Sequence, residues 1–172
     1  MTYEPQTGDF GLAQIKGHVG RLIRLGQWLN GDGFADYQHA FVHVGDGQVV
    51  EAMPGGAVRA PLAKYDAAQL AWYRCPREKA PAVCDEAVAL IGTPYSFADY
   101  LALAALRLKL APASLLRNYV ADSGHLICSA LVDRAYERGG VNLFTDGRLH
   151  GDVTPLDLYR LIREQRQEAR PV

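Results

Sequence analysis

Cys128 is the residue in this chain whose type and position are best suited to covalent chemistry. It opens an apolar segment, residues 128–136, whose spacing predicts a helix. Backbone N–H groups and the helix dipole at such an N-terminus favour a thiolate, and the same N–H groups can hold a developing oxyanion. A small buried core residue is the competing interpretation, because free cysteines commonly pack that way. The sequence leaves both interpretations open.

The other two cysteines lack this setting. Cys75 ends a predicted strand before Pro76, and Cys84 lies within a predicted amphipathic helix, so we interpret both as structural. Three cysteines cannot all pair with one another, and none is spaced as Cys-x-x-Cys. We therefore expect neither a disulfide framework nor a zinc site, and no cofactor.

A nucleophilic thiol needs a base, and histidine is the usual one. His39 and His43 lie four residues apart on one predicted strand, so strand alternation places them on the same face. His39 begins the strand directly after a loop, where a side chain can reach the edge of a cleft, whereas His43 lies nearer the following turn. His125 lies three residues before Cys128 and is interpreted as a loop neighbour. The remaining histidines are His18 and His150.

Glu51 is the candidate for the acid that orients the base. It lies in the apolar run of residues 49–52, where an acid needs a cationic or donor partner. With the turn at residues 46–47, paired positions add up to about 93, which places Glu51 near His43 or Phe41. A bulge would move it toward His39. A solvent-exposed strand glutamate is the alternative.

The elements that would position these residues form an α+β pattern. Residues 39–44 and 48–52 are predicted to pair as a hairpin, because the Asp-Gly pair at 46–47 favours a tight turn. Further strands are predicted at 8–15, 57–61 and 70–75. Helices are predicted at 19–29, 82–91, 100–110, 126–138 and 155–165, the last with Thr154 as N-cap. No repeat or linker is visible, so residues 1–172 are predicted to form one domain.

Composition excludes several classes of partner. The 172 residues are 49% hydrophobic and 22% charged, which is typical of a soluble globular domain. A net charge of −1 gives no reason to expect nucleic acid as a partner. No apolar run approaches the roughly 18 residues that a membrane span requires. The first residues lack the pattern of a secretory signal, so we expect a cytoplasmic protein, or one delivered to a cell wall by phage lysis or effector injection. The oligomeric state stays open.

Residues 39–52, HAFVHVGDGQVVEA, resemble the histidine hairpin of the circularly permuted NlpC-like cysteine hydrolases of the YiiX/YycO type. In that pattern the leading histidine is the base, which matches His39 and not His43, and the third polar residue matches Glu51. Residues 127–132, ICSALV, are similar to the family's cysteine helix, which matches Cys128 as the nucleophile.

Two shorter motifs support the resemblance. Residues 92–95, GTPY, are similar to the Gly-x-Pro-Tyr turn of NlpC-like proteins, whose tyrosine lies beside the nucleophile. Gly8-Asp9 resembles the pair that leads to the histidine strand in unpermuted relatives. The matches span about residues 8–140, in the order that moving the cysteine helix toward the C-terminus produces.

The resemblance implies a papain-like fold in circularly permuted order, with a small antiparallel sheet packed against helices that include the nucleophile helix. It implies a catalytic set of Cys128, His39 and Glu51, with Tyr95 and Ser129 positioning the oxyanion or the substrate. The stretch 99–124 is long and helical in pattern, and is interpreted as an insert, a lid or a plain core helix.

Three functions fit these expectations. The first is a cysteine amidase or endopeptidase that acts on peptidoglycan-type or other γ-linked peptide bonds through a thioacyl intermediate. The second is a lipid thioesterase or acyltransferase that uses the same residues, with 100–116 as an acyl-binding wall. The third belongs to another class, a non-catalytic binding module on this fold. Intact cysteine, histidine and acid positions weigh against the third.

Overall fold

A five-stranded antiparallel sheet forms the centre of the protein in this computed structural model, which describes residues 3–14, 37–53, 55–65, 70–94 and 128–169. The strands are β1 (Phe10–Ala13), β2 (His39–Gly45), β3 (Gln48–Met53), β4 (Gly56–Pro61) and β5 (Leu70–Tyr73). Their order across the sheet is β4-β3-β2-β1-β5, and each strand is antiparallel to its neighbours. The α+β class predicted from the sequence is confirmed.

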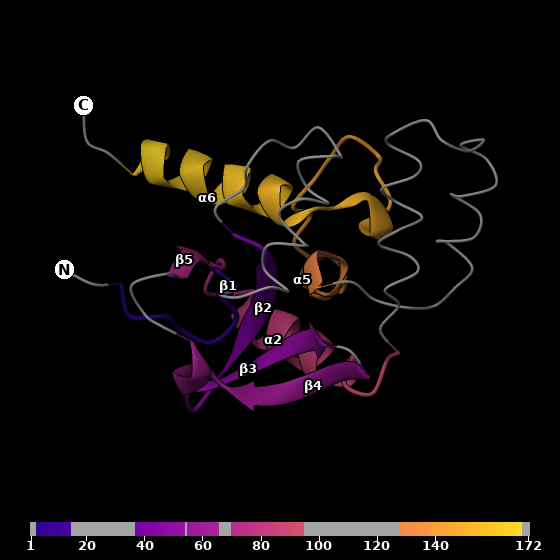
Figure 1. Ribbon diagram of the computed structural model, residues 1–172. Helices are drawn as coiled ribbons and strands as arrows, with labels where there is room; N and C mark the ends of the chain where they lie inside the picture. The colour runs from indigo at the N-terminus through magenta and orange to yellow at the C-terminus, as the bar shows by residue number, and fades with distance from the viewer. Residues whose placement is uncertain (1–2, 15–36, 54, 66–69, 95–127, 170–172) are drawn as a thin grey trace.

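Three α-helices accompany the sheet in the described part of the chain. Helices α2 (Ala80–Ala89) and α5 (Cys128–Arg138) pack against each other and against β2, while α6 (Pro155–Glu168) lies beside β5, as Figure 1 shows. Two 3-10 turns, η1 (Leu62–Lys64) and η3 (His150–Asp152), complete the described elements. Because α5 contacts both β2 and β3, its first residue lies near the hairpin that carries the candidate base.

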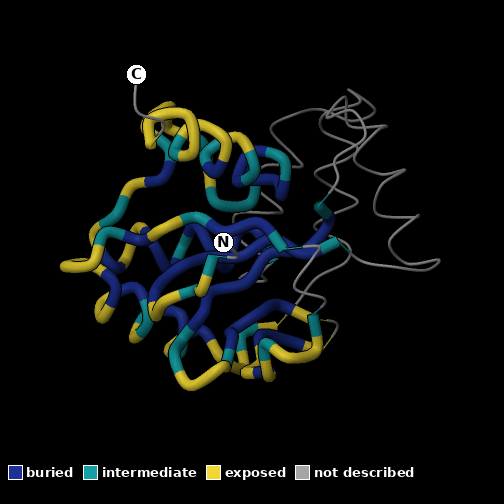
Figure 2. The backbone as a smooth tube through the Cα atoms, turned by 90° about the vertical axis from the view of Figure 1, so that its left-hand side faces the viewer, coloured by how far each residue is buried: buried dark blue, intermediate teal, exposed yellow. Residues whose placement is uncertain are grey.

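The two faces of the sheet have separate apolar clusters. The larger one joins the sheet to the helices and includes Phe10, Leu12, Val42, Val50, Leu131 and Tyr136. The smaller one lies on the opposite face and is built from Ala13, Phe41, Val49, Ala60 and Trp72. The central strands are buried while the outer side of α6 is exposed (Figure 2). The sheet is therefore rigidly held on both sides where β2 and β3 run.

The β2–β3 hairpin has a tight turn followed by a bulge. Asp46 and Gly47 both have positive φ angles, 49° and 65°, as the predicted Asp-Gly turn requires. Gly45 pairs with Gln48, but the register shifts by one residue between His43 and Gly45. Beyond this bulge His43 faces Val49 and Phe41 faces Glu51. The bulge thus decides which residue of β2 lies opposite the candidate acid.

Gly11 makes room for the aromatic residues on the smaller face. It lies opposite both Phe41 on β2 and Trp72 on β5. A Cβ atom at this position would come within 2.4 Å of the Phe41 ring and 2.8 Å of Trp72. Any larger residue at position 11 would therefore displace Phe41, the strand neighbour of the candidate base.

The other predicted elements have mixed outcomes. Residues 57–61 form a full strand, β4, on the outer side of β3. Thr154 caps α6 through a reciprocal capping box with Asp157, which confirms the predicted N-cap. The predicted helices at 19–29 and 100–110, and the proposed insert at 99–124, lie outside the described residues. Within the described ranges no helix is long and apolar enough to cross a membrane.

Candidate active site

His39 and Glu51 are in direct contact at the start of β2. The Nε2 atom of His39 lies 2.7 Å from Oε2 of Glu51. Both residues are nearly or fully inaccessible to solvent, with 6% and 0% of their surface exposed. The predicted contact between these two residues is therefore present, and the alternative of an exposed strand glutamate is wrong.

Cys128 completes this arrangement from the other side of the imidazole. It is the first residue of α5, and its thiol and the His39 ring are joined by a hydrogen bond. Because Nε2 of His39 faces Glu51, the ring nitrogen left for the sulfur is Nδ1. The backbone N–H groups of Ala40 and Ser129 also donate to the sulfur. Three segments, β2, β3 and α5, thus bring together a thiol, an imidazole and a carboxylate.

The electrostatics of the site favour a thiolate–imidazolium pair. Burial by itself would raise the pKa of Cys128, but the hydrogen bond and charge of His39 and the two backbone donors bring it below the usual value. Burial by itself would lower the pKa of His39, but hydrogen bonds to Cys128 and Glu51 raise it to about 9. Both shifts favour the state in which the proton is on the imidazole and the negative charge is on the sulfur.

Two residues that the sequence analysis did not single out also bind Glu51. Lys64, the last residue of η1, forms an ion pair with Oε1, and the hydroxyl of Tyr65 donates to Oε2. Burial alone would raise the pKa of Glu51, but hydrogen bonds from His39, Lys64 and Tyr65 lower it to about 2. The requirement of a buried acid for donors was recognisable in the sequence. Which donors satisfy it was not, because Lys64 and Tyr65 follow β4 and reach Glu51 only through the fold.

Aromatic packing fixes the position of Tyr65. Its ring stacks on Phe41 with centroids 4.7 Å apart, and Phe41 packs edge-on against Trp72 at 5.5 Å. The backbone N–H of Leu62 donates to the carbonyl of Gly47, which ties η1 to the hairpin turn. The donors to Glu51 are therefore held by the sheet and not by a free loop.

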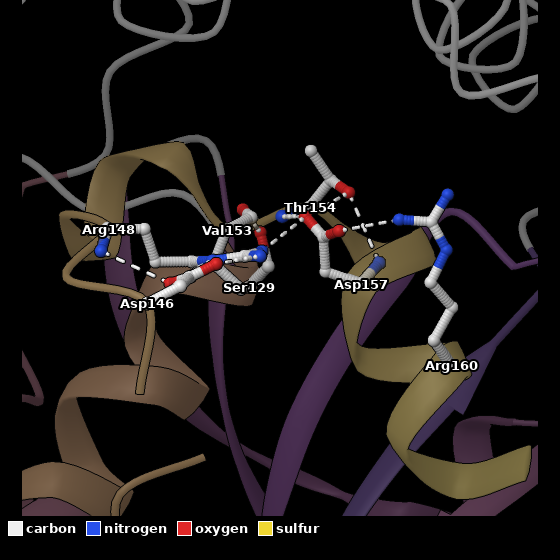
Figure 3. Close-up of polar contacts among 7 residues, drawn as sticks. All are labelled: Ser129, Asp146, Arg148, Val153, Thr154, Asp157 and Arg160. Carbon is white, nitrogen blue, oxygen red and sulfur yellow. Dashed lines mark hydrogen bonds and ion pairs between the residues drawn. The ribbon is translucent and has the colours of Figure 1, made fainter. Parts of the chain in front are cut away.

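Ser129 and Tyr95 were expected to position the oxyanion or the substrate. The hydroxyl of Ser129 is fully buried and donates to the carbonyl of Val153 at 2.6 Å, so this side chain faces inward. Figure 3 shows this bond linking the start of α5 to the segment that enters α6. A side-chain role for Ser129 toward substrate does not fit this geometry, whereas its backbone N–H faces the Cys128 sulfur. Tyr95 lies outside the described residues.

The remaining histidines and cysteines are not part of this arrangement. His43 is buried against Trp72, and its Nδ1 atom has no hydrogen-bond partner within the described part of the chain. His150 contacts Asp133 and Glu137 on α5 at 2.6 and 2.9 Å. Burial raises the pKa of both Cys75 and Cys84, the opposite of the direction at Cys128. His18 and His125 lie outside the described residues.

Asp9, from the Gly8-Asp9 pair, organises the start of β1 without contacting the thiol. Its buried carboxylate accepts hydrogen bonds from the backbone N–H groups of Gln6 and Cys75, at 2.8 and 3.0 Å, and from Tyr3 and Arg77. The backbone carbonyl of Asp9 accepts from the N–H of His43 at 2.8 Å. Asp9 thus supports, from the neighbouring strand β1, the strand that carries His39.

A separate cleft of about 270 Å³ opens between the loop after α5 and the first turns of α6. Its two arginines are paired with carboxylates: Arg148 contacts Asp146 and Asp157, and Arg160 contacts Asp157 at 3.1 Å (Figure 3). The described residues that line this cleft include neither a cysteine nor a histidine. We therefore place the candidate chemistry at Cys128, His39 and Glu51.

Neither possible metal ligands nor sequence similarity assigns a further role to this site. Across the described ranges, no group of three or more His, Cys, Asp or Glu side chains is arranged to hold a metal ion. Neither a protein-family model nor a curated protein matches this chain in sequence comparison.

Proposed function

We propose that this protein is a cysteine hydrolase that cleaves amide bonds, with Cys128 as nucleophile, His39 as base and Glu51 as the acid that orients His39. The observation that supports this most directly is the position of the His39 ring between the Glu51 carboxylate and the Cys128 thiol. A Cys-His-acid arrangement of this kind activates a thiol by keeping the imidazole in one tautomer and orientation.

The proposed reaction has two halves. In the first, the Cys128 thiolate attacks the carbonyl carbon of the amide, forming a C–S bond, and the negative charge moves to the carbonyl oxygen. Backbone N–H groups in the first turn of α5 have no partner within the helix and can stabilise that oxygen. As the C–N bond breaks, the His39 imidazolium gives its proton to the leaving amine.

The second half releases the acyl group. His39, now neutral, takes a proton from a water molecule whose oxygen attacks the thioester carbonyl. The C–S bond breaks, a carboxylic acid leaves, and the proton on His39 restores the ion pair with the Cys128 thiolate. Glu51 stabilises the imidazolium in both halves without changing its own protonation.

The proposed substrates are peptides of the cell wall, with amide bonds of the peptidoglycan type, and the proposed architecture is a papain-like fold in circularly permuted order. Both proposals rest on the resemblance of residues 39–52 and 127–132 to the permuted NlpC-like hydrolases. The antiparallel sheet with the cysteine at the start of a packed helix supports the architecture.

Mass spectrometry of reactions with two substrate sets tests this proposal. The purified full chain is incubated separately with peptidoglycan fragments and with acyl-lipids, and products are compared with those of Cys128→Ala. We expect cleaved wall peptides and a transient acyl adduct on Cys128. Release or transfer of fatty acyl groups would instead support a lipid thioesterase or acyltransferase, and binding without turnover or adduct would support a non-catalytic module.

A further inference from the structure

The carboxylate of Glu51 is shared among three donors. Oε2 accepts from His39 and from the Tyr65 hydroxyl, while Oε1 pairs with the Lys64 ammonium. Glu51 has no exposed surface, whereas the side chain of Lys64 is 35% exposed. A cation therefore reaches in from the solvent side and meets the acid on the edge opposite to the imidazole.

This second cation matters because a buried carboxylate acts strongly on a neighbouring imidazole. An unshared charge on Glu51 would hold the proton on His39 tightly, since opposite charges at hydrogen-bond distance favour the ionised forms. A general acid that must give its proton to a leaving amine works best when its pKa lies near the working pH. The pKa of His39 already stands at about 9, so further stabilisation of the imidazolium would hinder proton delivery.

We propose that Lys64 is a positioning residue of this site: its ammonium offsets part of the Glu51 charge, so that Glu51 orients His39 without holding the imidazolium proton too strongly. The pair of Glu51 and Lys64 then acts on the imidazole more like a neutral acceptor than like a free carboxylate. Lys64 does not touch the reacting atoms and acts only through Glu51.

The position of Lys64 is built into the fold. Residues 62–65 follow β4 directly. The bond from Leu62 N–H to the Gly47 carbonyl ties η1 to the hairpin turn, and the bond from Tyr65 N–H to the Leu62 carbonyl closes the 3-10 turn itself. Tyr65, whose ring stacks on Phe41, brings the adjacent Lys64 to the same carboxylate. A surface lysine held at random would not share its acceptor with a half-buried tyrosine and a buried histidine.

Several ionisable groups surround this pair. Cys128 on α5 acts on His39 from the other side, and His43 lies on the same face of β2. Burial and the Glu51 hydrogen bond raise the pKa of Tyr65 above its ordinary value, so it stays a neutral donor. On β4, Val58 faces Glu51 and brings no charge. Lys64 is thus the cation among these groups whose removal leaves the Glu51 charge without its ion-pair partner and takes away no part of the proposed reaction.

The test is the pH dependence of Cys128 alkylation in the full chain, with a parallel titration of the His39 ring by NMR. Lys64→Gln keeps a donor near Oε1 but removes the charge, and Lys64→Arg keeps the charge. We expect Lys64→Gln to move the loss of the His39 proton upward by on the order of one pH unit. Lys64→Arg should restore the parent profile, and Lys79→Gln, which removes an exposed lysine before α2, should not shift it.

A Lys64→Gln protein whose His39 titrates as in the parent chain would overturn the inference. If Lys64→Gln does not fold, Lys64→Met provides the same comparison, because it keeps most of the side-chain length and also removes the charge. The inference rests on the proposed function only for its effect on turnover. A shifted titration in a protein that cleaves no amide would reject the proposed function and keep the role of Lys64. Amide cleavage together with an unshifted His39 titration would keep the proposed function and reject the role of Lys64.

Discussion

Glu51 reaches His39 diagonally across the β2–β3 ladder. Its direct strand partner is Phe41, two residues further along β2, yet Oε2 of Glu51 lies 2.7 Å from Nε2 of His39. Diagonal neighbours on one face of a sheet lie roughly 7–8 Å apart, with their Cβ atoms somewhat closer, a distance that long or aromatic side chains can bridge. A glutamate and a histidine together have the length for this contact.

Replacing Glu51 by glutamine tests what its charge contributes. The amide oxygen can still accept from His39, but the amide nitrogen then faces the Lys64 ammonium, and the charge that stabilises the imidazolium is lost. We expect turnover to fall by on the order of a hundredfold, the lower range of a general acid–base contribution, while the fold is kept. Steady-state kinetics beside Glu78→Gln, an exposed carboxylate before α2, would check this. Near-equal rates in the two variants would exclude Glu51 from the reaction.

The order of thiol reactivity is a second prediction. Cys128 should be alkylated by iodoacetamide before Cys75 and Cys84 at neutral pH, because the environment of Cys128 lowers its thiol pKa while burial raises the other two. The difference should widen as the pH falls toward 6, where ordinary thiols are almost fully protonated. Peptide mapping after short labelling times measures the order. Earlier labelling of Cys75 or Cys84 would contradict the assignment of the nucleophile.

The two histidines of β2 should separate function from stability. His39→Ala removes the hydrogen-bond partner of Cys128, so the thiol pKa should rise toward its ordinary value and both alkylation at neutral pH and turnover should be lost. His43→Ala removes a buried ring that packs edge-on against Trp72, so it should lower the free energy of unfolding by roughly 2 kcal/mol or more. Urea unfolding and alkylation rates on both variants give the comparison. The reverse pattern would assign the base to His43.

Much of this arrangement was predictable because its parts are local in sequence. The Asp46-Gly47 turn and the alternating apolar residues define the hairpin, and the apolar spacing after Cys128 defines a helix with a thiol at its start. The choice of His39 over His43 came from the resemblance and not from the pairing. Without a bulge, the residue numbers of two facing positions add up to 93, as they do for Gly45 and Gln48. The bulge before Gly45 lowers this sum to 92 for the rest of the hairpin, which places Glu51 opposite Phe41.

The parts that the sequence did not predict depend on contacts between distant segments. Lys64 and Tyr65 follow an edge strand and meet Glu51 only because β4 folds back beside β3 and η1 is tied to the hairpin turn. The inward direction of the Ser129 hydroxyl depends on Val153, which lies 24 residues further along the chain. Neither contact has a local signal, since a lysine after a strand and a serine in a first helical turn are common on protein surfaces.

The last prediction concerns stability against pH, where His39 and Cys128 act in opposite directions. The pKa of His39 rises from 6.5 to about 9 on folding, so its stabilising contribution is complete below 6.5 and is lost as the pH rises toward 9. The pKa of Cys128 falls below 9.0 on folding, so its contribution is complete above 9.0 and is lost as the pH falls through the lowered value. Where the folded pair is a thiolate and an imidazolium and the unfolded pair is a thiol and a neutral imidazole, each state holds one proton, so the two pH dependences cancel.

Cys128→Ser should expose the contribution of His39 alone. The hydroxyl does not ionise in this range, so the variant keeps a histidine whose pKa is still raised by Glu51 but has no thiolate to compensate. Its free energy of unfolding should therefore fall relative to the parent protein as the pH rises above 6.5, with a slope of at most about 1.4 kcal/mol per pH unit. Urea unfolding of both proteins at pH 6.5, 7.5 and 8.5 measures this difference, and other titrating groups drop out because both chains share them. Parallel curves for the two proteins would mean that His39 takes up no extra proton on folding in Cys128→Ser, which would contradict this prediction.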